Sequence, residues 1–551
     1  MSAAFLYAGD KITCFGDIFL LLFFMQSGIL KKEVGFVSGN LFKWLDYCDD
    51  IRYYCDEEDR GDAKVKFYSH GETMEMYVTA EKSRVRKIEL RWKRKTENPA
   101  WILGDSWERA CGNLSWQPLN GDRAMPWYFL ATDGSRTLGV GVKTGASSYV
   151  CFSCDASGIT ASVDLRCGGV GVDLSGREIL ACTFVSKVYY DISQFEAAKE
   201  FCRLMCDNPI LPKEPVYGGN NWYYAYGKSS YEEIMADARL IAHLAGDNKN
   251  RPFMVIDDGW QINPCDGPWL PNEKFGDMKK IASEFKAMGV RPGIWFRPLM
   301  NTAVQAEHPD WCLVRGNSRC LDPSHPEVKK LIKEDVERIK SWGFELIKHD
   351  FTNFDVNGSY SYDLKGSITN FTGWSFYDNK KTGAEILREL YKLIKETAGD
   401  IYIIGCNTSP HLCAGYVEIN RVGNDTSGKM WNYNRKNGIN ALAFRLCQDN
   451  AFYKVDADCV GIFGDNIPWE LNRQWLDILS KSGTPLFVAV EPSAMTPQME
   501  RDLKEAFGIN SLQEDVVEPL DWMYNTSPQN WMINGQRYEY DFFMDEYPEI
   551  K

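Results

Sequence analysis

Histidine is scarce in this chain, with six copies among 551 residues. The six do not form an H-x-H or H-E-x-x-H pattern, so the spacing that binds zinc in metallohydrolases is missing. A G-x-S-x-G turn is missing as well, which removes the signal of a serine hydrolase. The chain also lacks a G-x-G-x-x-G or Walker phosphate loop, which disfavours a nucleotide-binding open sheet. We therefore expect neither a metal ion nor a cofactor.

Basic charge and long apolar runs are also in short supply. Lysine and arginine number 62 against 76 acidic residues, and the net charge of −14 disfavours nucleic acid as a partner. The apolar run IFLLLFFM, at 18–25, is too short to span a bilayer. Asp10 and Asp17 precede it without a basic segment, so we interpret it as a buried strand and not as a signal peptide. The sequence thus predicts no membrane partner.

Cysteine is plentiful, but its spacing does not indicate a disulfide framework. Its 17 copies are an odd number without regular spacing, so at least one thiol must be unpaired. A lone C-x-x-C at Cys151 and Cys154 has no second pair at zinc spacing, which favours ordinary buried thiols. Free thiols are typical of a reducing compartment. We therefore predict a cytoplasmic protein.

The first part of the chain has the pattern of β-structure. Apolar residues make up 44% of the sequence and aromatic residues 13%, enough for a large core. Residues 87–93 alternate apolar and charged side chains, and 178–190 is a second extended run. Pro209, Pro212 and Pro215 then mark a boundary. We predict an N-terminal β-sandwich domain over 1–212.

After this boundary, short apolar strands alternate with helices. The predicted strands are 217–224, 253–260, 291–298, 345–350, 401–406, 416–425, 452–458 and 485–490. Helical stretches at 231–245, 326–342 and 383–397 lie between them. This alternation predicts a (β/α)₈ TIM barrel over 213–508, so the fold class is α/β. The remainder, 509–551, contains Asn534-Gly535 between strand-like runs, which predicts a short C-terminal β-hairpin element.

Polar side chains gather at the carboxyl ends of the predicted barrel strands. They include Trp222, Asp257, Asp258, Trp295, Arg297, Lys348, Asp350, Cys406, Asn407, Arg421 and Asp425. Barrel active sites lie at these ends, so we expect the side chains to meet in one mouth. Paired carboxylates with hydroxyl-binding and aromatic neighbours are typical of a glycosidase. In the strand 345–350, Lys348 and Asp350 share a face, and the ammonium favours an ionised Asp350.

Several of these segments resemble glycoside hydrolase clan D, the α-galactosidase superfamily, over residues 217–507. The similar motifs are NNWYYAYG, VIDDGW, RPGIWFRP, IKHD, RVGND and LNRQWLDILSKSGTPLFVA. The β-rich region before the barrel makes the chain most similar to family 36. The resemblance implies a retaining exo-α-glycosidase acting on terminal α-galactosides of an oligosaccharide or other glycoside.

The resemblance also implies roles for the residues at the strand ends. Asp350 would be the nucleophile and Asp425 the acid/base. The predicted substrate-binding residues are Trp222, Asp257, Asp258, Trp295, Arg297, Lys348, Cys406, Asn407 and Arg421. Of these, Asp257 and Asp258 would bind the galactose 4- and 6-hydroxyls.

Two positions depart from the family pattern. Arg297 stands where many family 36 enzymes have glutamate, and Asn407 follows the strand-5 cysteine, where related enzymes read the sugar's 2-position. The 2-substituent, hydroxyl or acetamido, therefore stays open. The alternatives are an α-N-acetylgalactosaminidase, another glycosidase of the clan, a retaining transglycosylase of the raffinose type, and a non-catalytic carbohydrate-binding protein. A homo-oligomer is also left open.

Overall fold

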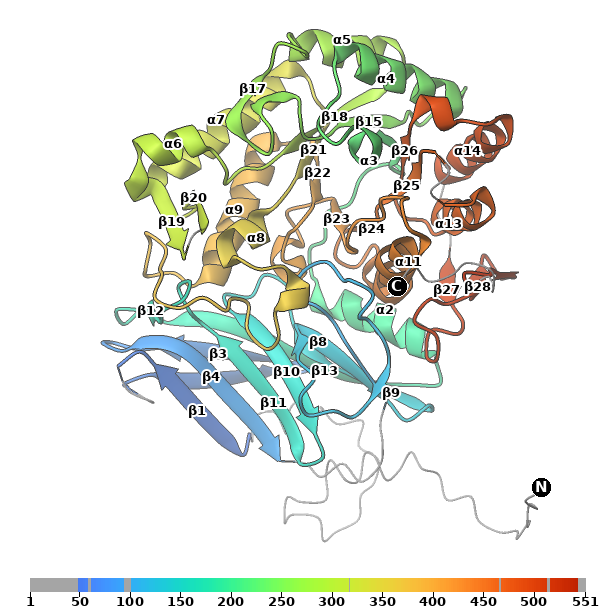
Figure 1. The fold of residues 1–551 in the computed structure, drawn as a ribbon. Coiled ribbons are helices and arrows are strands. Elements are labelled where there is room, and N and C mark those ends of the chain that lie inside the picture. Colours follow the sequence, from blue (N-terminus) through green and yellow to red (C-terminus); the bar gives the residue numbers. More distant parts are fainter. Residues whose placement is uncertain are drawn as a thin grey trace, which may run out of the picture.

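The computed structural model describes residues 48–57, 61–93, 101–316, 318–464, 467–512 and 516–543. Figure 1 shows antiparallel sheets at one end of the molecule and a parallel sheet with its helices at the other. The apolar run at 18–25 lies outside the described residues, so its predicted strand stays a prediction. No helix of the described residues is long and apolar enough to cross a membrane.

Two antiparallel sheets form the N-terminal part of the fold. One has the order β1 (Asp50–Cys55), β4 (Arg84–Lys93), β11 (Gly158–Asp164), β10 (Tyr149–Asp155), β7 (Met125–Pro126), with β12 (Val172–Asp173) beside β4. The other has the order β2 (Lys64–His70), β3 (Thr73–Thr79), β13 (Ile179–Tyr190), β9 (Arg136–Val142), β8 (Tyr128–Thr132), β5 (Trp101–Gly104), β6 (Gln117–Pro118). Trp92 and Phe152 of the first sheet both contact Phe184 of the second. The sheets therefore pack against each other, as the β-rich pattern predicts.

The second part is built on a parallel sheet. Its order is β24 (Lys454–Asp456), β23 (Ile419–Arg421), β22 (Tyr402–Gly405), β21 (Leu346–His349), β18 (Arg291–Phe296), β15 (Phe253–Ile256), β14 (Tyr217–Asn220), β26 (Leu486–Val490), β25 (Cys459–Ile462). All eight predicted strands are present, which confirms the parallel sheet. The sequence did not predict β25, which follows β24 after two residues. Closure of the sheet into a barrel stays a prediction.

Long helices lie along this sheet (Figure 1): α4 (Tyr231–Ala245), α5 (Met278–Ala287), α7 (Pro326–Trp342), α9 (Gly383–Ala398), α13 (Trp469–Lys481) and α14 (Pro497–Asn510). The periodicity of α7 predicts one apolar face, on which Val328, Ile332, Val336 and Ile339 are buried and Leu331 is partly buried. Pro326 begins that helix and Gly343, with φ 90°, ends it. The predicted ranges of α4 and α7 agree with the structure.

Shorter elements fill the connections. Helix α2 (Gln194–Met205), of 12 residues, follows β13. The short helices are α3 (Trp222–Ala225), α6 (Thr302–Glu307), α8 (Thr352–Asn357), α10 (Pro410–Cys413), α11 (Trp431–Tyr433), α12 (Asn440–Arg445), η2 (Pro309–Trp311), η3 (Ser361–Asp363), η4 (Asn434–Ile439), η5 (Leu446–Gln448) and η6 (Pro492–Ala494). The small antiparallel sheets join β16 (Gln261–Asn263) with β17 (Asp266–Pro271), β19 (Cys312–Arg315) with β20 (Ser318–Leu321), and β27 (Val517–Pro519) with β28 (Asn530–Ile533) and β29 (Gln536–Glu539). The hairpin predicted at Asn534-Gly535 is confirmed, because both residues have positive φ between β28 and β29.

A loop of the N-terminal part docks on the parallel sheet. This loop follows β5, and its Asp105 accepts hydrogen bonds from the fully buried Arg445 of α12 and from Gln448. Ala110 forms backbone hydrogen bonds with Val422 and Asn424, which follow β23. The loop 105–110 thereby lies against the carboxyl end of the parallel sheet.

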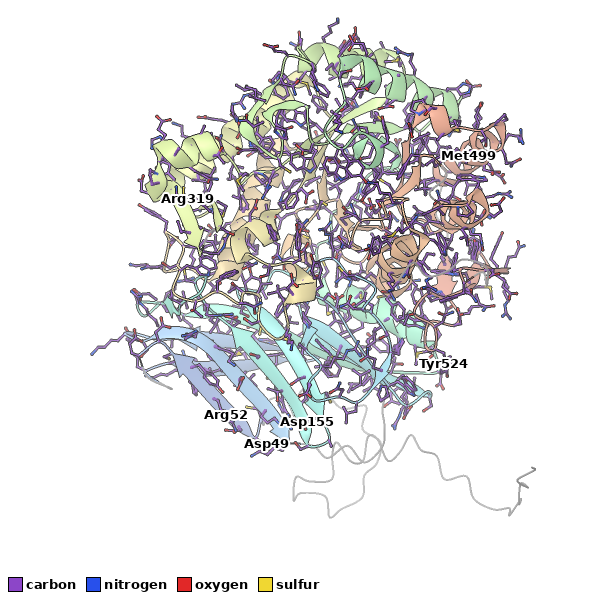
Figure 2. The ribbon with its side chains drawn as sticks, in the orientation of Figure 1. Asp49, Arg52, Asp155, Arg319, Met499 and Tyr524 are labelled. Atoms are coloured by element: carbon purple, nitrogen blue, oxygen red, sulfur yellow. The ribbon has the colours of Figure 1, made fainter. Side chains whose placement is uncertain are left out.

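Replacing Asp105 by alanine is expected to lower the free energy of unfolding by about 3–5 kcal/mol, because it leaves the Arg445 charge buried without its partner. Urea denaturation followed by tryptophan fluorescence measures the change. Arg52→Ala is the control: Arg52 forms an exposed ion pair with Asp50 on β1 (Figure 2), and its loss should leave the midpoint unchanged. Equal midpoints for Asp105→Ala and wild type would contradict the prediction.

Candidate active site

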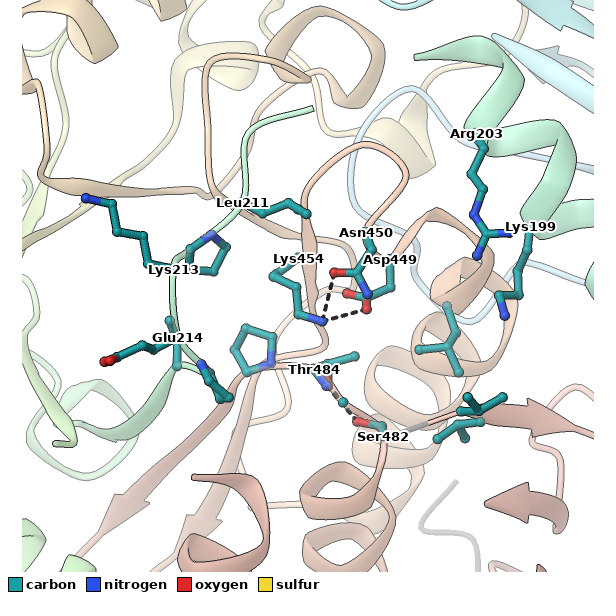
Figure 3. Close-up of a pocket in the computed structure, with 18 residues that line it drawn as sticks. Lys199, Arg203, Leu211, Lys213, Glu214, Asp449, Asn450, Lys454, Ser482 and Thr484 are labelled. Atoms are coloured by element: carbon teal, nitrogen blue, oxygen red, sulfur yellow. Dashed lines mark hydrogen bonds and ion pairs between the residues drawn. The ribbon is translucent and has the colours of Figure 1, made fainter. Parts of the chain in front are cut away.

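A cavity lies at the amino ends of the parallel strands, and it is larger than the one at their carboxyl ends. It has a volume of about 550 Å³ and lies beside Val216, Lys454 and Pro485, which begin or precede β14, β24 and β26 (Figure 3). Its two acids are Glu214, on the linker, and Asp449, which already pairs with Lys454 at 2.8 Å. Barrel-type sites form at the opposite ends of the strands. Cavity size therefore does not identify the site.

The smaller cavity lies at the carboxyl ends and has a volume of about 240 Å³. Its lining residues are Arg109, Trp222, Tyr223, Asp257, Asp258, Cys265, Trp295, Lys348, Asp350, Phe351, Tyr360, Tyr362, Cys406, Asn407, Arg421, Asn424 and Asp425. Ten of the predicted residues are in this set, which leaves Arg297 outside it. The side chains that the sequence placed at separate strand ends thus meet in one cavity.

Asp350 lies on the floor of this cavity and is 7% exposed. Trp295 Nε1 donates to its Oδ2 at 3.1 Å, and Asn407 Nδ2 donates to its Oδ1 at 3.0 Å. Burial alone would raise the pKa of Asp350, but the charges of Lys348 and Arg109 and these two hydrogen bonds lower it to about 2. Asp350 is therefore a carboxylate throughout the neutral pH range.

Lys348 does not bond to Asp350 directly. Its Nζ lies 2.6 Å from Asp257 Oδ2, which also accepts a hydrogen bond from Asn220 Nδ2 at 2.7 Å. Burial opposes the charge of Lys348, but Asp257 and Asp350 raise its pKa above the ordinary value. The predicted effect of Lys348 on Asp350 is thus electrostatic, while Asp257 is its hydrogen-bonding partner.

Asp258 is fixed by the turn that follows it. Gln261 Nε2 donates to Asp258 Oδ1 at 2.5 Å, and the Cys265 N–H donates to the same oxygen at 2.8 Å. The Asp258 N–H donates in turn to Asp257 Oδ1 at 2.9 Å. Two adjacent carboxylates therefore line the cavity in fixed and different orientations.

Asp425 lies at the mouth, and its side chain is 49% exposed. Arg421 Nη2 donates to Asp425 Oδ1 at 3.0 Å, and Arg109 Nη1 donates to the same oxygen at 3.3 Å. The Arg421 guanidinium also lies 2.8 Å from Asp458 Oδ2. Burial raises the pKa of Asp458, but Arg421 and the Thr426 N–H outweigh it and lower that pKa. Asp458 thus holds Arg421 against Asp425.

Arg297 lies behind the cavity wall. Its guanidinium makes two bonds to the buried Asp355, at 2.9 and 2.5 Å, and stacks on the ring of Phe351. The structure therefore pairs Arg297 with a carboxylate on α8, and its predicted contact with substrate stays untested.

Backbone strain accompanies the site. Phe351, Asn407 and Asp458 follow strands β21, β22 and β24, and each has a left-handed φ, of 65°, 60° and 77°. Such a conformation is costly for residues other than glycine and is common where function requires a fixed direction. Here it aims the Phe351 N–H at Asp350 Oδ1, 2.7 Å away.

Sequence reasoning missed several lining residues. Phe351 lines the cavity and follows β21, so the strand-end rule could have found it. Asp458 does not line the cavity but pairs with the lining residue Arg421, and it ends the predicted strand 452–458. Arg109 and Tyr360 lie on loops and Tyr362 lies on the short helix η3, and only tertiary packing brings them to the cavity. Within the described residues, no group of three histidine, cysteine, aspartate or glutamate side chains is arranged to hold a metal ion.

No protein-family model matches the chain, and no curated protein does either. Several solved structures do match the chain. The α-galactosidase TtGalA from Thermus thermophilus, in complex with p-nitrophenyl α-D-galactopyranoside, is 15% identical with a TM-score of 0.58, covering 87% of this chain and 99% of its own. A variant of the family 36 α-galactosidase AgaA from Geobacillus stearothermophilus, in complex with raffinose, is 16% identical with a TM-score of 0.60, covering 86% and 71%.

An α-galactosidase from Lactobacillus brevis is similar as well, at 13% identity and a TM-score of 0.55, covering 81% of this chain and 65% of its own. At these identities the likeness concerns the fold. It extends over the antiparallel sheets and the parallel sheet together, because each match covers more than four fifths of the chain. The chain therefore has the fold of the α-galactosidases of glycoside hydrolase family 36.

Proposed function

We propose that this protein is a retaining exo-α-galactosidase, with Asp350 as nucleophile and Asp425 as general acid and base. One observation carries the proposal: a single cavity holds a buried, ionised Asp350 and a half-exposed Asp425 at its mouth. Two carboxyl groups in different environments are what double displacement requires. Solved structures with the same fold, in complex with an α-galactoside and with raffinose, support the substrate class.

The mechanism follows from the two positions. An Asp350 oxygen attacks the anomeric carbon, the bond to the leaving oxygen breaks, and Asp425 gives its proton to that oxygen. Asp425, now a carboxylate, then takes a proton from water, whose oxygen attacks the same carbon and releases Asp350. Two inversions return the α configuration. Arg421 and Arg109 orient Asp425 during both steps.

The adjacent carboxylates of Asp257 and Asp258 are evidence for a substrate of galacto configuration. Asp257 and Asp258 follow β15 and line the same cavity as Asp350, and their carboxylates are fixed in different directions. Galactose presents an axial 4-hydroxyl next to its 6-hydroxyl, so each acid accepts from one of the two. Lys348, bonded to Asp257, adds a donor at the same place.

Asn407 faces the 2-position in this arrangement. Because ionised Asp350 only accepts hydrogen bonds, the Asn407 amide must point its Nδ2 there and its Oδ1 away. That Oδ1 is buried and lacks a hydrogen-bond partner within the described part of the chain. The bulk of asparagine at this place favours a 2-hydroxyl over the larger acetamide.

We also infer that the parallel sheet closes into a (β/α)₈ barrel. β24 pairs with β23, β25 pairs with β26, and Ala457 and Asp458 alone separate β24 from β25. The two strands then act as one bent strand that connects both ends of the sheet. A closed barrel explains why so many strand ends reach one cavity.

A substrate panel tests the function. With EDTA present, nitrophenyl α-galactoside is expected to exceed nitrophenyl α-glucoside in kcat/KM by roughly 10- to 200-fold, because an equatorial 4-hydroxyl leaves a buried acid unpaired, at about 1–3 kcal/mol. Nitrophenyl α-N-acetylgalactosaminide and β-L-arabinopyranoside complete the panel. Faster turnover of the glucoside or of the acetamido sugar would contradict the assignment, as would inactivity on all four.

A further inference from the structure

Three aromatic rings stack in the connection between β21 and α9. The ring centroids of Phe354 and Tyr360 are 4.3 Å apart with planes 24° from parallel, and those of Tyr360 and Tyr362 are 5.4 Å apart at 18°. Phe354 begins the stack beside Phe351, which lines the cavity. Tyr362 ends it and is 55% exposed. One face of the Tyr362 ring is therefore covered by Tyr360, and the other is open to solvent.

The stack is bonded to the loop that carries Arg109, a residue that contacts Asp425. Ser361, between the two tyrosines, donates its hydroxyl proton to the backbone oxygen of Arg109 at 2.5 Å. The guanidinium of that arginine reaches Asp425. Trp107 Nε1 donates to Lys365 O at 2.8 Å, which ties the same connection down a second time. Tyr360 and Tyr362 are thus held beside the proposed acid/base.

The difference in burial between Asp350 and Asp425 indicates how the substrate is oriented in the cavity. Asp350 is buried, whereas half of the Asp425 side chain is exposed. The galactose must contact Asp350 on the floor, and the leaving oxygen must contact Asp425. The group that leaves with this oxygen therefore extends from the mouth, past Asp425 and toward Tyr362, which lines the same cavity.

We propose that the open face of Tyr362 is an aglycone subsite that binds the second sugar ring of an oligosaccharide. This inference rests on the proposed α-galactosidase function and adds the class of leaving group. The C–H face of a pyranose is apolar and slightly positive, and it packs on the negative face of an aromatic ring. Tyr360 stiffens the platform from behind, and Arg109 fixes its distance from Asp425.

The test compares substrates with and without a second ring. We expect Tyr362→Ala to lower the ratio of kcat/KM for melibiose, a galactosyl-glucose, to kcat/KM for methyl α-galactoside by about 3- to 10-fold. Tyr362→Phe keeps the ring and should keep the ratio. Tyr524→Ala is the control and should keep the ratio, because Tyr524 (Figure 2) is 86% exposed between β27 and β28 and does not line the cavity.

An unchanged ratio in Tyr362→Ala overturns the subsite while the α-galactosidase function stands. A ratio that falls equally in Tyr362→Phe overturns it too, because the ring would then not be the binding element. If wild type hydrolyses neither melibiose nor methyl α-galactoside, the proposed function fails and the subsite fails with it.

Discussion

Replacing Asp350 by asparagine is expected to lower kcat/KM on nitrophenyl α-galactoside by about 10⁴-fold or more, because the chain then lacks the group that attacks the anomeric carbon. The side chain keeps its size, so the cavity keeps its shape. The hydrogen bonds from Trp295 and Asn407 show that this carboxylate is oriented as well as ionised. Steady-state kinetics measures the loss, and an unchanged urea midpoint establishes that the variant is folded.

Chemical rescue identifies the role of the missing group. In Asp350→Gly, azide fits the vacated space and attacks from the same side, so added azide should restore turnover and give β-galactosyl azide, with inverted configuration. The product is read by proton NMR. Rescue that yields the α product, or a loss below about 10-fold in Asp350→Asn, would contradict a nucleophilic Asp350.

The sequence predicts which side chains meet in the cavity, because strand ends follow simple rules. Alternation places Lys348 and Asp350 on one face, and parallel strands bring their carboxyl ends to one edge. Ten of the predicted residues line the cavity for this reason. The hydrogen-bonding partner of each residue could not be predicted from the alternation or from the strand ends. Lys348 on β21 bonds to Asp257 after β15 across the intervening strand β18, so this contact depends on the stagger of all three strands.

Arg297 and Arg109 show that a position at a strand end does not decide which arginine contacts the cavity. Both charges look alike in a sequence, but Arg297 at the end of β18 is paired with Asp355 outside the cavity. Arg109, in a loop after β5, contacts Asp425. The distance along the chain between Arg109 and Asp425 is 316 residues, and nothing local signals the contact. Long-range docking, as in the Asp105–Arg445 pair, decides it.

The locations of helices and strands along the chain were predicted more closely than the residues at which the strands end. Capping residues define α4 and α7, so their bounds follow from the sequence. The predicted strand 416–425 shortens to Ile419–Arg421, because its last residues leave the sheet to pair with Ala110 and to carry Asp425. Strand β25 was missed because two residues separate it from β24, too few for a recognisable turn.

Replacing Asp425 by alanine is expected to produce a loss that depends on the leaving group. Melibiose, whose sugar leaving group needs a proton, should lose about 10²–10⁴-fold in kcat/KM. An activated dinitrophenyl α-galactoside leaves as a stable anion, so its first step should change little. The slope of log kcat/KM against leaving-group pKa measures this, and it should become steeper than in wild type.

Azide and a matched variant complete the argument for Asp425. In Asp425→Ala the galactosyl group still reaches Asp350, so azide should attack that intermediate and give α-galactosyl azide, with retained configuration. Asp258→Asn removes a negative charge from the same cavity, but we propose that Asp258 binds substrate hydroxyls, so this variant should weaken kcat/KM without changing the slope. A steeper slope in Asp258→Asn would contradict its proposed role as a hydroxyl-binding residue, because that carboxylate would then transfer the proton. β-Galactosyl azide from Asp425→Ala would contradict its proposed role as acid/base, because the nucleophile would then be the missing group.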